Sequence, residues 1–386
     1  MNARLLESAT AVAGVAAQYC DEVDRDARFP REAVRSMKEN RLLGAMIPRE
    51  LGGEGASLKE IADVCCLIGQ NCSAAGMTFA MHQIKTASLV SHGVASGWHR
   101  DFMARMTKEQ LLIASATTEA GIGGDLRNSI CAVERDGERF RLRKDAAVIS
   151  YGVHADAILV TARRAPDAPS SDQVMVAVTK DQYTLERTAE WNTLGMRGTC
   201  SEGYIFEAKG AAEQIFPKPF ADIAAQSMLA TSHILWSSLW YGIATNALSK
   251  AQAYVRAEAR KKPGAPPPGA LRVAEGANML QLMKTGIVAA LLRNENAQRS
   301  PDELTSMSFA IEMNNLKIGS SRLAVDIVQH AMMVCGIMGY KNDTPFSLGR
   351  HLRDIMSAPI MINNDRIFAN TSNMLLIHKL DQRLVG

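Results

Sequence analysis

The chain has 386 residues, of which 47% are hydrophobic and 22% are charged, so it is long enough for two or three structural units with ordinary globular composition. These values exclude intrinsic disorder and collagen-like repeats. The 43 basic and 40 acidic residues give a formal net charge of +3 without a long basic block, so no dedicated nucleic-acid-binding surface is expected.

The first residues predict no targeting segment, because no apolar stretch of the signal-peptide kind follows them. The most apolar stretch, 234–248, is interrupted by serine, threonine and asparagine and predicts no membrane span. The 7 cysteines are odd in number and form no C-x-x-C pair, which favours reduced thiols over disulfides or a zinc site. We therefore expect a cytoplasmic protein without a metal site.

Residues 1–110 predict an N-terminal helical domain. Pro30 lies near the first turn of one expected helix, and the glycine-rich segment 51–55 breaks the chain after it. Ser57 is expected to cap the next helix, and the apolar stretch 74–93 is expected to be buried.

Residues 111–218 predict a middle β domain, a barrel or a sandwich. Asp136-Gly137 stands between two alternating runs and indicates a hairpin. Further strands are expected at 157–161, 174–178 and 203–206.

Residues 219–386 predict a C-terminal helical domain. The segment 262–269 contains four prolines and two glycines, so no helix is expected to cross it. Ser300-Pro301-Asp302-Glu303 is typical of a helix start, and 321–335 is apolar with helical spacing. The fold class expected from this order of helices, sheet and helices is α+β.

The segment 115–125 combines hydroxyl side chains with glycines. Thr117 and Thr118 precede Gly121, Gly123 and Gly124. Backbone N–H groups in such a loop can approach a flat or anionic ligand closely, although a plain turn has the same composition. The segment matches neither a P-loop nor a G-x-G-x-x-G motif.

Seven motifs follow one another in a recognisable order. They are Ile47–Gly53, Thr117–Asp125, Val148–Gly152, Leu194–Thr199, Arg260–Gly264, Gly336–Tyr340 and Arg350–Asp354. Each motif alone is weak, but their order along nearly the whole chain resembles the acyl-CoA dehydrogenase family. The resemblance implies bound FAD, a C-terminal four-helix bundle, and a homodimer or homotetramer in which FAD spans two subunits.

The resemblance also implies roles for individual residues. Thr118 corresponds to the threonine that bonds the flavin, and Gly124 takes the place of the usual serine. Val148-Ile149-Ser150 replaces the usual Trp-Ile-Thr/Ser triplet, and Arg260 would meet FAD phosphates of a neighbouring subunit unless it is only a solvated helix end. The expected cofactor-binding residues are Thr117, Thr118, Gly123, Gly124, Ile149, Ser150, Arg260 and Asn364.

The expected catalytic base is missing from its usual place. Dehydrogenation of a thioester needs a carboxylate within reach of the α-proton. The family glutamate would fall on Ile362, and the second place used in the family, 230–234, also lacks a carboxylate. Asp365 is the first candidate, unless it pairs with Arg366 or caps the last helix. His233 is the second candidate, unless it is a hydrogen-bonded core residue.

Three functions remain open. The first is α,β-dehydrogenation of an acyl thioester, with CoA or a carrier protein as the handle and an electron-transfer partner as the oxidant. The second is a flavin monooxygenase that uses oxygen on aromatic or sulfur substrates. The third is a non-redox or non-catalytic protein that has kept the fold and lost the base.

Overall fold

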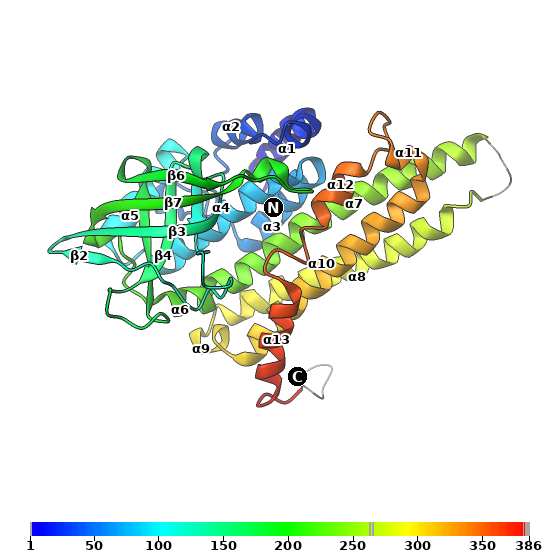
Figure 1. Ribbon diagram of the computed structural model, residues 1–386. Coiled ribbons are helices and arrows are strands. Elements are labelled where there is room, and N and C mark those ends of the chain that lie inside the picture. Colours follow the sequence, from blue (N-terminus) through cyan, green and yellow to red (C-terminus); the bar gives the residue numbers. More distant parts are fainter. Residues whose placement is uncertain (1, 262–263, 265, 381, 383–386) are drawn as a thin grey trace.

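The computed structural model describes residues 2–261, 264, 266–380 and 382, and its elements follow in three groups along the chain (Figure 1). The first group is helical, the second forms two sheets, and the third is helical again. This confirms the α+β class and the order of helices, sheet and helices. The residue limits of the three domains stay a prediction.

The N-terminal group is made of amphipathic helices around one buried helix. Its members are α1 (Ala3–Arg25), α2 (Arg31–Glu39), α3 (Leu58–Asn71), α4 (Ser73–His92) and α5 (Gly97–Glu109). Ser57 caps α3 in a capping box with Glu60, as expected. Most side chains of α4 are buried, because α4 packs against other helices and against the first strand of the middle group.

The middle group is a two-sheet structure. Its strands are β1 (Ile113–Ala116), β2 (Glu134–Asp136), β3 (Arg139–Ser150), β4 (Ala157–Arg163), β5 (Gln173–Thr179), β6 (Tyr183–Ala189) and β7 (Ser201–Ala211). One sheet has the order β1-β4-β5, with β1 parallel to β4, and the other has the antiparallel order β2-β3-β7-β6. Asp136 pairs with Arg139 across the β2–β3 turn, which confirms the hairpin. Apolar side chains of both sheets share one core with the helices.

The C-terminal group is built on long helices that lie side by side (Figure 1). They are α7 (Leu229–Lys261), α8 (Ala270–Ala297) and α10 (Met307–Cys335), with α6 (Phe220–Ile223), α9 (Pro301–Leu304), α11 (Ile337–Tyr340), α12 (Gly349–Ile355) and α13 (Asn364–Leu375) around them. A π-helical turn, Ala224–Met228, leads into α7. The expected break at 262–269 separates α7 from α8, although 262, 263 and 265 lie outside the described residues. No helix of the described chain is long and apolar enough to cross a membrane.

Helix α12 ties the three groups together. The guanidinium of Arg353 pairs with Asp24 of α1. The carboxylate of Asp354, which is buried, accepts a hydrogen bond of 2.7 Å from the backbone N–H of Met196 in the middle group. These contacts hold the last part of the chain in a fixed position relative to the sheets.

Candidate functional site

The loop after β1 requires glycine at several positions. Gly121, Gly123 and Gly124 have φ values of +86°, +58° and +78°, a region that favours glycine. A Cβ atom at Gly124 would overlap the guanidinium of Arg366, whereas Gly123 has nothing within 4 Å of that position. The loop is therefore a specific structure with open space over Gly123.

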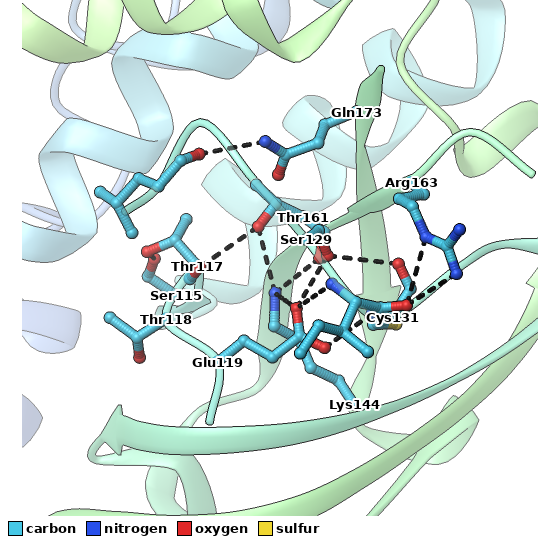
Figure 2. Close-up of polar contacts among 12 residues, drawn as sticks. Ser115, Thr117, Thr118, Glu119, Ser129, Cys131, Lys144, Thr161, Arg163 and Gln173 are labelled. Carbon is cyan, nitrogen blue, oxygen red and sulfur yellow. Dashed lines mark hydrogen bonds and ion pairs between the residues drawn. The ribbon is translucent and has the colours of Figure 1, made fainter. Parts of the chain in front are cut away.

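The carboxylate of Glu119 holds this loop in place (Figure 2). It accepts hydrogen bonds from Ser129 Oγ (2.8 Å), Ile130 N (3.0 Å) and Cys131 N (2.6 Å), and only 5% of Glu119 is exposed. Lys144 Nζ lies 3.8 Å away, so the carboxylate is also part of a buried ion pair. A buried charge that is paired and fully hydrogen-bonded is tolerated in a core, and here it fixes both ends of the loop.

Lys144 connects the loop to the neighbouring sheet. Its Nζ donates to the backbone oxygen (2.7 Å) and to Oγ1 (3.2 Å) of Thr161 in β4. Burial lowers the pKa of Lys144, and the nearby Glu119 opposes that shift. The Thr161 hydroxyl in turn donates to the backbone oxygen of Thr117 at 3.5 Å. The backbone around Thr117 and Thr118 is therefore held by the hydrogen bond from Thr161 and by the contacts of Glu119.

Two predicted cofactor-binding hydroxyls lie at the junction of this loop and β3. Thr118 Oγ1 donates to the backbone oxygen of Val148 (3.0 Å), and Ser150 Oγ lies 2.7 Å from Ser201 Oγ. Both side chains are half-buried, and each hydroxyl oxygen keeps a lone pair that could accept an N–H from a ligand. Ile149, which stands between Val148 and Ser150 in β3, is fully buried. Its side chain therefore belongs to the core, and only its backbone could contact a ligand.

These residues fit a flavin. A flavin ring offers N–H and C=O groups along one edge, and the hydroxyls and backbone N–H groups here can pair with both. The glycines let the backbone approach the ligand without Cβ contacts, as the open space at Gly123 shows.

The start of α13 docks on the glycine loop. Asn363 caps the helix by accepting from the N–H of Asp365 (2.8 Å), and the guanidinium of Arg366 donates to the backbone oxygen of Gly123. The carboxylate of Asp365 is exposed, and it makes no hydrogen bond or ion pair with any residue in the described part of the chain. Asp365 thus neither pairs with Arg366 nor caps the helix.

A buried lysine, Lys317, holds the turn before α13 in place. Lys317 Nζ donates to the backbone oxygen of Ile362 and to Asn364 Oδ1, both at 2.7 Å. Asn364 Nδ2 donates to Ser321 Oγ at 3.0 Å, so the amide of Asn364 is engaged within the protein. Burial lowers the pKa of Lys317 to about 8. Ile362 has φ +49°, a left-handed conformation that this anchoring maintains.

Arg260 lies apart from this arrangement, whereas His233 lies near Lys317, whose charge acts on the imidazole. His233 is 3% exposed, its Nδ1 lies 2.9 Å from the backbone oxygen of Met313, and burial lowers its pKa to about 4. Arg260 is exposed near the end of α7, which points away from the sheets (Figure 1). Within one chain, the structure therefore brings together the threonine–glycine loop, Ser150 and the start of α13, but not Arg260.

Several site residues were missed by sequence reasoning. Lys144 stands at an inward position of an alternating strand, and Lys85 stands inside the expected buried stretch 74–93. A lysine at an otherwise apolar, inward position was the available signal. The contact of Arg366 with Gly123 had no such signal, because these residues are 243 positions apart.

Comparisons with known proteins identify related chains. Residues 5–108 match the model of the acyl-CoA dehydrogenase N-terminal domain, and residues 223–362 match that of the C-terminal domain. The amino sugar nitrososynthase DnmZ of Streptomyces peucetius is 25% identical over 88% of this chain and 84% of its own length. The mitochondrial short-chain specific acyl-CoA dehydrogenase of Bos taurus is also 25% identical, over 86% of this chain and 79% of its own.

A solved structure extends the likeness of fold to the whole chain. FMN-bound TdsC of Paenibacillus sp. A11-2, a dibenzothiophene monooxygenase, superposes with a TM-score of 0.86 at 19% identity and covers 98% of both chains.

Proposed function

Since this chain belongs to the acyl-CoA dehydrogenase family, we propose that it is an FAD-dependent oxidoreductase that introduces a double bond into an acyl thioester. The observation that carries this proposal is the hydrogen bond from Arg366 to the backbone oxygen of Gly123. Through it, the turn with the uncommitted carboxylate of Asp365 lies beside the loop suited to a flavin. The bound flavin would supply the acceptor for a hydride from the β-carbon.

The residues of the chain divide the remaining tasks. Thr118 and Ser150 position the flavin through their hydroxyl oxygens, and the Glu119–Lys144 pair keeps their loop in place. The carboxylate of Asp365 accepts the α-proton, and the electron pair of that C–H bond becomes the new α,β double bond as the β-hydride leaves. Arg366 is a positioning residue, because it fixes the first turn of α13 on the loop.

The test is anaerobic mixing of the FAD-loaded protein with acyl-CoAs of varied length. The wild type is expected to lose its flavin absorption band as the flavin is reduced. Asp365→Asn is expected to keep the flavin but to be reduced at least about 100-fold more slowly, the usual loss when a general base is removed. Asp343→Asn changes an exposed aspartate between α11 and α12, away from the start of α13, and should behave as the wild type.

Two results would contradict this assignment. Unchanged reduction of Asp365→Asn would show that Asp365 is not the base. A flavin-loaded wild type that no acyl-CoA reduces would exclude the dehydrogenase reaction.

A second candidate is a flavin-dependent monooxygenase. This candidate is favoured by the lack of a carboxylate at position 362. Ile362 stands where the family glutamate would stand, and Lys317 anchors its backbone oxygen. TdsC, which shares the fold, is described as a dibenzothiophene monooxygenase and has been crystallised with indole. Oxygen consumption by the protein with reduced flavin and either compound, with an oxygenated product, would support this candidate.

A further inference from the structure

Lys85 is a buried amine without an anion. It lies in the middle of α4 and is 3% exposed. Its one hydrogen-bond partner among the described residues is the thioether sulfur of Met228, at 3.4 Å, and sulfur is a weak acceptor. The positive charge of Lys144 repels the protonated amine of Lys85.

The other deeply buried lysines differ from Lys85 in this respect. Lys144 has the carboxylate of Glu119 and two oxygens of Thr161, and Lys317 has two oxygen acceptors at 2.7 Å. Burial, together with Lys144, lowers the pKa of Lys85 to about 7, which is the usual response of an amine that lacks a partner. A charged amine without a partner is costly to bury, and an anionic group of a ligand would supply the partner that Lys85 lacks.

Lys85 lies on the helix that packs against β1, the strand that leads to the candidate flavin site. One turn earlier on α4, His82 Nδ1 accepts the backbone N–H of Ile113 at 3.0 Å, so α4 is joined to β1 and β1 leads directly to Thr117. Met228, on the other side, ends the π-helical turn before α7. π-helical turns are frequent at functional sites. Lys85 therefore stands where α4, β1 and the start of α7 meet.

We propose that Lys85 is the counter-ion for an anionic group of the substrate, so that the site prefers an acyl group that ends in a carboxylate. This inference rests on the proposed function and names its substrate class. A CoA or carrier-protein handle stays connected to solvent, whereas Lys85 is buried. The amine therefore meets the end of the acyl group farthest from the handle.

The test uses two probes with the same number of carbons, glutaryl-CoA and pentanoyl-CoA, on the FAD-loaded protein without oxygen. Affinity is read from the change in the flavin spectrum. The wild type is expected to bind glutaryl-CoA at least about tenfold more tightly, as a charge-assisted hydrogen bond provides. Lys85→Met is expected to lose or reverse this preference, and Lys209→Met, an exposed lysine of β7, is the matched control that keeps it.

The outcomes separate this proposal from the proposed function. Reduction of the flavin by acyl-CoAs without a preference for glutaryl-CoA leaves the dehydrogenase reaction intact and overturns the role of Lys85. Equal losses of reduction rate with both probes in Lys85→Met would overturn it too, because Lys85 would then act on the reacting carbons. If no thioester reduces the flavin, the proposed function fails. Binding of free glutarate then tests separately whether Lys85 is a counter-ion for a carboxylate. Glutarate should then raise the melting temperature of the wild type but not that of Lys85→Met, and equal effects on both would overturn the proposal.

Discussion

At the scale of single residues, the arrangement depends on how buried charges are matched. Glu119 and Lys144 form an ion pair with 3% or less of either side chain exposed. Such a pair adds little net stability compared with apolar side chains, but removing one partner leaves a buried charge. The pair therefore acts mainly by fixing the loop that carries Thr117 and Thr118.

We predict that Glu119→Gln lowers the free energy of unfolding by about 3 kcal/mol, because Lys144 then lacks its anion. Urea denaturation measures this change, and the same variant should lose flavin on gel filtration. Glu207→Gln is the control, since its ion pair with Arg143 is exposed and its loss should cost less than about 1 kcal/mol. Equal stability of the two variants would contradict the assigned role of Glu119.

Lys85 predicts a pH dependence of stability. Its pKa is about 7 in the folded protein, against an ordinary value of 10.5, so between these values the unfolded chain holds more protons. The free energy of unfolding therefore rises with pH in this window, by up to about 1.4 kcal/mol per pH unit. Denaturation from pH 7 to pH 10 should show this contribution in the wild type and not in Lys85→Met, whereas equal slopes would contradict the burial of an unpaired amine.

At the scale of elements, Lys317 of α10 holds the turn that leads into α13. We predict that Lys317→Met loses about 2 kcal/mol of stability, since the backbone oxygen of Ile362 and the amide oxygen of Asn364 each lose a donor. Hydrogen exchange should become faster in residues 362–367, because the first turn of α13 loosens. Lys284→Met, at an exposed position of α8, should leave both measurements unchanged. Unchanged exchange in Lys317→Met would show that the turn is held by other contacts.

Local sequence signals predicted some elements well and others not at all. The Ser57 capping box and the Asp136-Gly137 hairpin depend on neighbouring residues, and the structure confirms both. Strand β1 was missed because its four residues do not alternate and its partner, β4, follows it more than forty positions later. Strand β6 was missed because it is a mostly exposed edge strand without an apolar face.

The candidate site also combines segments that local sequence signals indicate with contacts that they do not. The motif order pointed to the threonine–glycine loop and Ser150 as candidates, because each belongs to a short contiguous segment. The partners of Lys85 and Arg366 lie 143 and 243 positions away, so only the folded chain brings them into contact. Whether the eight expected cofactor-binding residues, and Asp365 and His233 as catalytic residues, have these roles stays a prediction.

At the scale of the whole molecule, the C-terminal helices expose large apolar side chains. Leu271, Leu282 and Leu292 of α8 are 71%, 57% and 55% exposed, so this helix presents several large apolar side chains to solvent in a single copy of the chain. Arg260 is in the last turn of α7, at the end of the helix that points away from the sheets of its own chain (Figure 1). Both features favour association of several copies.

We predict a homodimer or homotetramer in sedimentation or light-scattering measurements. Leu282→Glu should shift the population toward smaller species, because a carboxylate would be buried at the contact. Arg260→Ala should weaken flavin retention without changing the oligomer. A wild type that remains monomeric at high concentration would contradict the proposed contribution of Arg260 from a neighbouring copy.

The visible absorption spectrum of the purified protein tests most directly whether an isoalloxazine ring binds against the threonine–glycine loop. After incubation with excess FAD and gel filtration, we expect a stoichiometric flavin band that Gly124→Ala loses, since φ at Gly124 is +78° and a Cβ there would also displace the Arg366 guanidinium from the loop. Protein that emerges colourless from the same treatment would contradict the account.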